Sequence, residues 1–197
     1  MDIITAIVPT LHGWCTVEKA EKIYRLIIDN NLKSGVELGV FGGRSLFPMA
    51  LACKETGGHV TGIDPWNKEA CLEGDNSPEN AKWWSNIDYN YMYTYTCNLF
   101  KDNYLEEIVS LRRVKSEEAV LFFTNESLDF IHQDSNHSEK ISCDEVERWL
   151  PKLKVGGYWI ADDTNWETTR VAQQYLTTNG CEEIYDSGSW KIYKKIT

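Results

Sequence analysis

The sequence predicts an α/β fold with a seven-stranded, mostly parallel sheet, an antiparallel last strand and helices on both faces. The first observation is alternation: strand-like apolar segments alternate with segments of helical periodicity through the second half of the chain. This pattern is typical of a parallel sheet covered by helices. The second observation is that only Ser187-Gly188-Ser189 joins the last two strand-like segments. So short a connection predicts a hairpin, and the two strands of a hairpin are antiparallel.

The individual elements follow from apolar spacing and from glycine breakers. Val17, Ala20 and Ile23 recur at helical spacing after Thr16, a typical helix-starting residue. Gly57-Gly58 separates the next helix from the second strand. Strands are expected at residues 34–40, 59–64, 111–115, 127–133, 156–161, 182–186 and 190–196. Helices are expected at residues 16–30, 45–55, 116–123, 138–150 and 166–179.

Residues 1–197 are predicted to form a single domain, because the chain has no repeat or Pro-rich linker and its length suits one core. Within it, residues 1–32 are expected to be an N-terminal helical cap, and residues 65–98 an aromatic-rich insertion. Tyrosines stand at every second position from 89 to 95 of this insertion. They fit a strand or helix surface packed on the core, or a lid over a ligand.

Composition and charge exclude several classes of partner. The chain has 20 Lys and Arg against 30 Asp and Glu, a net charge of −10, and no basic stripe that would attract nucleic acid. Its apolar runs fall short of the roughly 20 residues of a membrane span, and no secretion signal is evident. We expect a cytoplasmic protein with a small-molecule partner, no membrane or nucleic-acid partner, and a homodimer as an open alternative. The six dispersed cysteines are expected to be free thiols without a catalytic role.

A glycine-rich turn between the first strand and the next helix is the first candidate for ligand binding. Its sequence is Glu37-Leu38-Gly39-Val40-Phe41-Gly42-Gly43-Arg44-Ser45. Glycines there let the backbone turn sharply and approach a ligand beside the N–H groups of the helix. Asp64 ends the next strand, where dinucleotide sites place an acid for the ribose hydroxyls. Phe41 stands where G-x-G-x-x-G has its second glycine, which disfavours an NAD-type Rossmann oxidoreductase.

The same turn resembles motif I of class I S-adenosylmethionine (SAM) methyltransferases, in the variant of the catechol O-methyltransferase-like and other small-molecule O-methyltransferases. The resemblance implies a Rossmann-like sheet and SAM as the cofactor. The residues that it implies are Glu37, Gly39, Phe41 and Gly43 for the methionine part of SAM, Ser45 near its carboxylate, Asp64 for the ribose, and Ser116 and Glu117 beside the adenine. His12-Gly13-Trp14 before the first long helix is also similar to the start of this subgroup.

Three carboxylates follow the fourth and fifth predicted strands. Asp134 ends one strand, and Asp162 and Asp163 follow the next. Parallel strands bring their carboxyl ends to one edge of a sheet, so we expect these acids to lie close together. They would repel one another unless a cation or bound protons relieve them, and oxygen ligands at an open site suit Mg²⁺. Capping and turn roles are the alternatives for each acid alone.

The resemblance extends to these carboxylates. Metal-dependent O-methyltransferases of this fold have an acid after strand four and an acidic pair or acid–amide pair after strand five, the positions of Asp134 and of Asp162-Asp163. Asp134-Ser135-Asn136-His137 is also similar to the D-x-x-H of macrolide-sugar O-methyltransferases, which implies His137 as the general base. His132 and Asp134 form an H-x-D pair as well, but an iron-binding facial triad of that kind belongs to β-folds.

Taken together, the residues predict a SAM-dependent methyltransferase that methylates a hydroxyl group of a small molecule with the help of Mg²⁺. Trp14, Trp66 and the aromatic insertion are expected to shape the acceptor pocket. Three alternatives remain open at this point. They are a non-catalytic SAM-fold binding module, an NAD-type Rossmann oxidoreductase, and a methyltransferase that needs no metal and acts on O, N or C.

Overall fold

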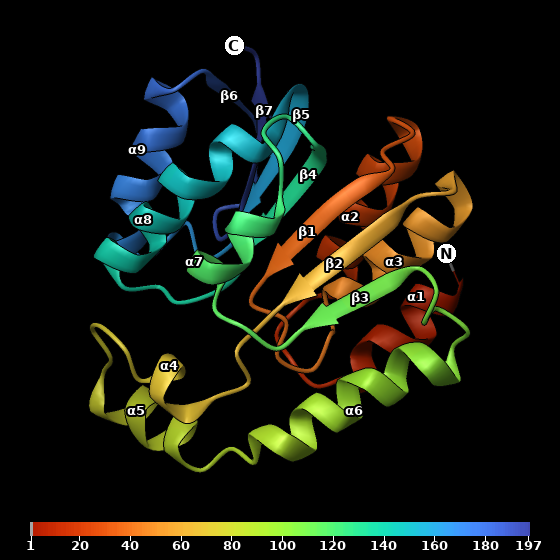
Figure 1. The fold of residues 1–197 in the computed structure, drawn as a ribbon, viewed down its shortest axis with the longest axis vertical. Helices are drawn as coiled ribbons and strands as arrows, with labels where there is room; N and C mark the ends of the chain where they lie inside the picture. The colour runs from red at the N-terminus through yellow and green to blue at the C-terminus, as the bar shows by residue number, and fades with distance from the viewer. Residues whose placement is uncertain (1) are drawn as a thin grey trace.

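The computed structural model describes residues 2–197 as one seven-stranded sheet between two layers of helices (Figure 1). The strands are β1 (Ser34–Leu38), β2 (His59–Ile63), β3 (Val109–Arg112), β4 (Leu128–Gln133), β5 (Leu153–Ala161), β6 (Cys181–Asp186) and β7 (Lys191–Lys195). Their order across the sheet is β3-β2-β1-β4-β5-β7-β6. The first five strands are parallel, and β7 is antiparallel to both of its neighbours. The predicted fold class, including the antiparallel last strand, is confirmed.

Helices cover both faces of this sheet. They are α1 (Asp2–Ile7), α2 (Val17–Asp29), α3 (Leu46–Thr56), α4 (Lys68–Cys71), α5 (Pro78–Ser85), α6 (Tyr89–Asp102), α7 (Ser116–Ala119), α8 (Glu139–Trp149) and α9 (Arg170–Thr178). Short 3-10 turns adjoin them at η1 (Val8–Thr10), η2 (Val120–Phe122), η3 (Leu150–Lys152) and η4 (Glu167–Thr169). Residues of α1, α2, α3 and α6 belong to one apolar core, and residues of α7, α8 and α9 belong to a second core.

The two cores explain why the central strands are almost continuously apolar. Side chains alternate along a strand, so neighbouring residues point to opposite faces of the sheet. Phe130 of β4 belongs to the first core and Ile131 to the second, and in β5 Ile160 and Trp159 divide in the same way. A strand with helices on both faces therefore needs apolar side chains at successive positions.

Several predicted boundaries differ from those observed. Strand β1 ends at Leu38 rather than at residue 40, and β5 begins at Leu153 rather than at residue 156. Strand β3 begins at Val109 rather than at residue 111, because Val109 pairs with Val60 of β2 and is buried. The helix predicted at 116–123 is α-helical only through α7 and continues as the turn η2. The helix predicted at 166–179 begins with the turn η4 before α9.

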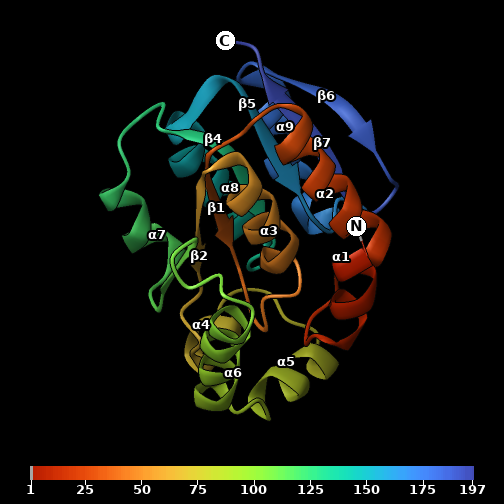
Figure 2. The same cartoon turned by 90° about the vertical axis from the view of Figure 1, so that its right-hand side faces the viewer.

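The tyrosine run of the insertion lies on a helix. Asp88 caps α6 by accepting a hydrogen bond from the backbone N–H of Tyr91 at 2.9 Å. The buried face of α6 is formed by Met92, Thr96, Leu99 and Phe100, which are spaced for a helix. The strand interpretation of these tyrosines is therefore wrong, because burial follows helical spacing rather than alternation. Figure 2 shows α6 below the sheet, at the same end of the molecule as α4 and α5.

The N-terminal segment packs against the glycine turn. Residues 2–32, the described part of the predicted cap, contain α1, η1 and α2, whereas residue 1 lies outside the described residues. Nη1 of Arg44 donates a hydrogen bond to the carbonyl of Gly13 at 2.8 Å. A Cβ added at Gly42 would lie 2.5 Å from Cβ of His12, so glycine permits this close contact.

All six cysteines are free thiols in the structure, as the sequence predicts. Burial raises the pKa of Cys15 and that of Cys53 to about 12, so neither thiol is a nucleophile near neutral pH. Within residues 2–197, none of the helices combines the length and the apolar character that crossing a membrane requires.

The ends of β1, β2 and β4 are fixed to one another around Gly39. The N–H of Gly39 donates to the carbonyl of Ile63 at 2.9 Å, and the N–H of Asp134 donates to the carbonyl of Leu38 at 2.8 Å. Gly39 has φ +86°, and a Cβ there would lie 2.0 Å from the carbonyl oxygen of Asp134. Only glycine lets the turn after β1 lie this close to the turn after β4.

We expect Gly39→Ala to destabilise the fold more than Gly156→Ala does. Gly156 has φ +87° with no atom within 4 Å of an added Cβ, so alanine there brings only the left-handed backbone cost of about 1–2 kcal/mol. Alanine at residue 39 adds a clash with backbone, which costs about 1–3 kcal/mol more. Urea unfolding of both variants measures the difference, and equal losses would show that the close approach to Asp134 is not rigid.

Candidate active site

A large cavity lies at the carboxyl ends of the parallel strands, where open α/β sheets bind ligands. In Figure 1 the arrowheads of β1, β2 and β3 point toward the segment that carries α4 and α5, and residues of both helices line the cavity. Its volume of about 1770 Å³ exceeds that of a typical single-ligand site, roughly 300–1,000 Å³, and leaves room for two reactants. The predicted site residues that line it are Gly39, Phe41, Ser45, Asp64, Ser116, Glu117, Asp134, His137, Asp162 and Asp163.

Asp64 holds the glycine turn in place. Its Oδ2 accepts hydrogen bonds from the backbone N–H groups of Val40 and Phe41 at 3.0 and 2.9 Å. Its Oδ1 accepts one from the N–H of Trp66 at 2.6 Å. Burial raises the pKa of Asp64, while these three N–H donors and the charge of Arg113 favour the carboxylate. The residue predicted to bind ribose is thus also a clamp on the turn.

Phe41 has an unusual backbone that the surrounding structure fixes. Its φ of +50° is uncommon for a residue with a side chain. Its carbonyl accepts hydrogen bonds from Nε1 of Trp66 at 2.8 Å and from Oγ1 of Thr96 at 2.9 Å. Together with the bond from its N–H to Asp64, these contacts determine where its ring enters the cavity. Strained backbone of this kind occurs preferentially at functional sites.

Two residues predicted for SAM do not appear among the described residues that line the cavity. Glu37 is fully buried, and its Oε1 lies 2.8 Å from Nδ1 of His132. Burial raises the pKa of Glu37 well above its ordinary value and lowers that of His132 to about 3, so both groups favour their neutral forms. Gly43 faces α6, where an added Cβ would lie 3.2 Å from Leu99. Glu37 and Gly43 therefore support the glycine turn from outside the cavity.

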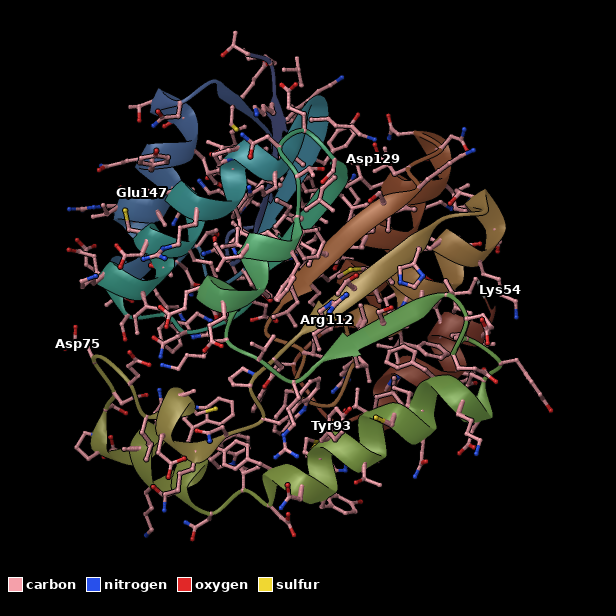
Figure 3. The ribbon with its side chains drawn as sticks, in the orientation of Figure 1. Lys54, Asp75, Tyr93, Arg112, Asp129 and Glu147 are labelled. Carbon is pink, nitrogen blue, oxygen red and sulfur yellow. The ribbon has the colours of Figure 1, made fainter. Side chains whose placement is uncertain are left out.

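Four of the aromatic side chains that line the cavity contact one another. Trp14 stacks on Phe41 with ring centroids 5.3 Å apart, and its centroid lies 5.0 Å from that of Trp83. Trp84 contacts both Phe41 and Trp83. Trp66 also lines the cavity, but it is only 1% exposed, packs against Tyr93 and donates its hydrogen bond to Phe41. In Figure 3 the labelled Tyr93 lies on α6, below the end of β3.

The three predicted carboxylates meet at the other side of the cavity, as their strand positions suggested. Ligand atoms of Asp134, His137 and Asp163 lie within 4.8 Å of one another, and those of His132, Asp134 and Asp162 do so too. Nε2 of His137 is 2.8 Å from Oδ2 of Asp163 and 3.8 Å from Oδ1 of Asp134. The two triads share Asp134.

Protonation at this cluster reflects burial and crowding. Burial, followed by the charge of Asp162, raises the pKa of Asp134 to about 7. Burial alone would lower the pKa of His137, but hydrogen bonds and charge from Asp134 and Asp163 raise it to about 10. The two carboxylates therefore favour the imidazolium form of His137 in this arrangement.

The comparison with known families decides the identity of the domain. Residues 36–164, which carry the glycine turn, Asp64 and all three carboxylates, match a family model described as "Methyltransferase domain". The chain belongs to this family. It is a methyltransferase with a Rossmann-like fold, and the NAD-type oxidoreductase alternative is set aside. No curated protein sequence matches this methyltransferase.

Solved structures share the fold of the methyltransferase at low sequence identity. The O-methyltransferase NovP is 17% identical with a TM-score of 0.74, over 94% of this chain and 83% of that chain. The methyltransferase PaMTH1 of Podospora anserina, solved with S-adenosylhomocysteine (SAH) bound, is 12% identical with a TM-score of 0.67, over 93% and 80%. A putative caffeoyl-CoA O-methyltransferase of Staphylococcus aureus is 18% identical with a TM-score of 0.65, over 97% and 88%.

Two buried charged residues that line the cavity are not evident as such from the sequence. Lys19 of α2 is 3% exposed, and its Nζ forms an ion pair with Oδ2 of Asp162. A lysine in the first turns of an amphipathic helix ordinarily faces solvent, so no local signal reveals it. Glu145 of α8 is also 3% exposed, and its Oε2 accepts hydrogen bonds from Nε2 of Gln133 at 3.0 Å and Oγ of Ser135 at 2.6 Å. Glu145 thereby fixes the turn that carries Asp134.

The donor atoms fit a hard divalent cation at one of the two triads. Asp134 and Asp163 offer carboxylate oxygens at the cavity wall, with His137 as their cationic neighbour. The predicted third ligand, Asp162, is paired with Lys19. A divalent ion therefore has two carboxylates open to it, whereas Asp162 is accessible only if Lys19 moves.

We expect Asp64→Asn to weaken binding of SAH and to lower stability by about 1–3 kcal/mol without any ligand, because an amide cannot accept all three N–H donors. Asp129→Asn is the matched control. Its Oδ2 accepts the N–H groups of Lys33 and Ser34 at 2.8 and 2.9 Å, at the end of the sheet away from the cavity (Figure 3).

Calorimetric titration with SAH and urea unfolding of both variants separate the two effects. Asp129→Asn should lose stability yet keep its affinity for SAH. An Asp64→Asn variant of unchanged stability would show that the carboxylate does not hold the turn.

Proposed function

We propose that this methyltransferase transfers the methyl group of SAM to a hydroxyl group of a small molecule, assisted by Mg²⁺. The observation that supports the proposal best is one cavity that holds both the fixed glycine turn and the triad of Asp134, His137 and Asp163. NovP, TomG and other proteins of similar structure are named as O-methyltransferases, which agrees with a hydroxyl acceptor.

SAM is proposed to bind over the turn that follows β1. The residues proposed to contact it are Gly39, Phe41 and Ser45 for the methionine part, Asp64 for the ribose, and Ser116 and Glu117 for the adenine. Each oxygen of Asp64 can accept further hydrogen bonds, because a carboxylate oxygen has more than one acceptor direction. Clamping the turn and binding ribose hydroxyls are therefore compatible roles.

Asp134 and Asp163 are proposed to hold the Mg²⁺ ion. Asp162 becomes a third ligand only if Lys19 moves away from it. A bound divalent cation lowers the pKa of an acceptor hydroxyl and fixes its oxygen. Methyl transfer from a sulfonium needs no covalent enzyme intermediate, so positioning is the main task of the side chains. Well-oriented reactants can gain roughly 7–11 kcal/mol from positioning.

His137 is proposed as the residue that takes the proton of the acceptor hydroxyl. Its Nε2 lies 2.8 Å from Asp163 at the cavity wall, within the triad. A cation held by Asp134 and Asp163 would repel the proton that His137 carries, and after that proton passed to solvent, Nε2 would be free to accept the proton of the acceptor hydroxyl. Trp14, Phe41, Trp83 and Trp84 offer the acceptor an aromatic wall on the other side.

Calorimetric titration with SAM, SAH and NAD, each with Mg²⁺ and again with EDTA, tests the cofactor. We expect SAM and SAH to bind at micromolar concentration and NAD not to bind. A methyl-transfer assay with labelled SAM and 3,4-dihydroxybenzoate, a simple probe with vicinal hydroxyls, then tests the reaction class. Binding of NAD without SAM would contradict the proposal.

Asp134→Asn should reduce Mg²⁺-dependent methyl transfer strongly, by about tenfold or more, and leave SAH affinity nearly unchanged. Asp102→Asn, an exposed carboxylate at the end of α6, serves as the control and should behave as the unchanged protein. Calorimetry measures SAH affinity, and the labelled-SAM assay measures transfer. A non-catalytic binding module would tolerate Asp134→Asn without effect, and equal loss of SAH binding and stability would make Asp134 a structural residue.

A further inference from the structure

Lys19 is a buried charge that the proposed reaction leaves unexplained. It lies in the first turns of α2, outside the matched residues 36–164, where Oγ1 of Thr16 accepts its backbone N–H at 3.1 Å. Its Nζ reaches across to Asp162 at the end of β5, and the ring of Trp190 lies 5.7 Å from Nζ. Three separate parts of the chain thus enclose one ammonium group.

An enclosed ammonium group is stable only beside a group of opposite charge. Burial disfavours the charged form of Lys19, but the charges of Asp162 and Asp134 raise its pKa overall. In return, Lys19 lowers the pKa of Asp162 although burial opposes the ionised form. A buried ammonium without such a partner would be strongly destabilising, so the pair holds together as a unit.

The carboxylate that Lys19 pairs with belongs to a second triad, His132, Asp134 and Asp162. His132 is fully buried, its Nδ1 is bonded to Glu37, and its Nε2 has no hydrogen-bond partner within residues 2–197. This unpartnered Nε2 is the nitrogen donor that the triad would offer to a metal ion. One imidazole nitrogen with two carboxylates is a donor set that divalent metal ions, transition metals among them, accept.

We propose that Lys19 is a built-in cation that keeps metal ions out of the His132–Asp134–Asp162 triad and so leaves Asp134 and Asp163 as the site for a divalent ion. The inference rests on the proposed metal-assisted function. Lys19 and a metal ion compete for the same carboxylate, because both need Asp162 and would repel each other at this distance. Lys19 thus decides which of the two triads a metal ion occupies.

Titration with Co²⁺ tests the inference directly, because Co²⁺ accepts nitrogen and oxygen ligands and its visible absorption reports their type. Lys19→Met should bind Co²⁺ at least about tenfold more tightly than the unchanged protein, a difference of about 1.4 kcal/mol, with new visible bands. Lys19→Arg keeps the charge and should behave as the unchanged protein. Lys22→Met, an exposed lysine of α2 whose Nζ lies over the ring of Tyr185, is the matched control.

The outcomes separate this inference from the proposed function. Tighter Co²⁺ binding by Lys19→Met supports the inference. Failure of the unchanged protein to bind Mg²⁺ would refute only the proposed Mg²⁺ site. Unchanged Co²⁺ affinity in a Lys19→Met variant that is folded by circular dichroism and binds SAH overturns it. If Lys19→Met does not fold, Lys19→Gln, which keeps a hydrogen-bond donor but no charge, gives the same two outcomes.

Discussion

Two backbone N–H groups, those of Val40 and Phe41, point at one carboxylate oxygen of Asp64, and the shape of the cavity depends on this contact. The contact joins the turn after β1 to the end of β2 and holds Phe41 in its left-handed conformation. The ring of Phe41, positioned in this way, contacts Trp14 and Trp83 and forms an aromatic wall with them. Gly39 completes the arrangement, because it lets the same turn lie against the backbone of Asp134. The cofactor side and the carboxylate side of the cavity are thus built on one rigid turn.

The carboxylate side is governed by charge balance. Asp134, Asp162 and Asp163 lie together in a buried or half-buried setting, where uncompensated negative charge is costly. Lys19 and His137 compensate it from two directions, one from α2 and one from the turn after β4. A cation that enters this cavity must therefore displace Lys19 or His137 from the carboxylates, or bind beside them. This balance links the N-terminal segment to the chemistry, although that segment lies outside the matched methyltransferase family model.

Much of this architecture was predictable because its causes are local in the sequence. Apolar periodicity gave the seven strands, and Gly39, Asp64 and Asp134 stand at strand ends that motif and topology identify without coordinates. The tyrosines of α6 were ambiguous, since alternate aromatic residues fit a strand until the burial of Met92 and Thr96 is known. The contacts between Lys19 and Asp162 and between Glu37 and His132 could not be predicted. They join residues 143 and 95 positions apart, and they depend on side-chain directions that no local pattern specifies.

The measurement that tests the account most directly is a crystal structure of the protein grown with SAH and Mn²⁺, with the ion located by its anomalous scattering. We expect SAH over the turn of Gly39 and Phe41 with its ribose at Asp64, and Mn²⁺ bound by Asp134 and Asp163 while Lys19 stays paired with Asp162. A structure with SAH bound elsewhere in the cavity would contradict the central role of the turn. Mn²⁺ bound by His132 and Asp162, with Lys19 displaced, would contradict the inference that Lys19 keeps metal ions away from Asp162.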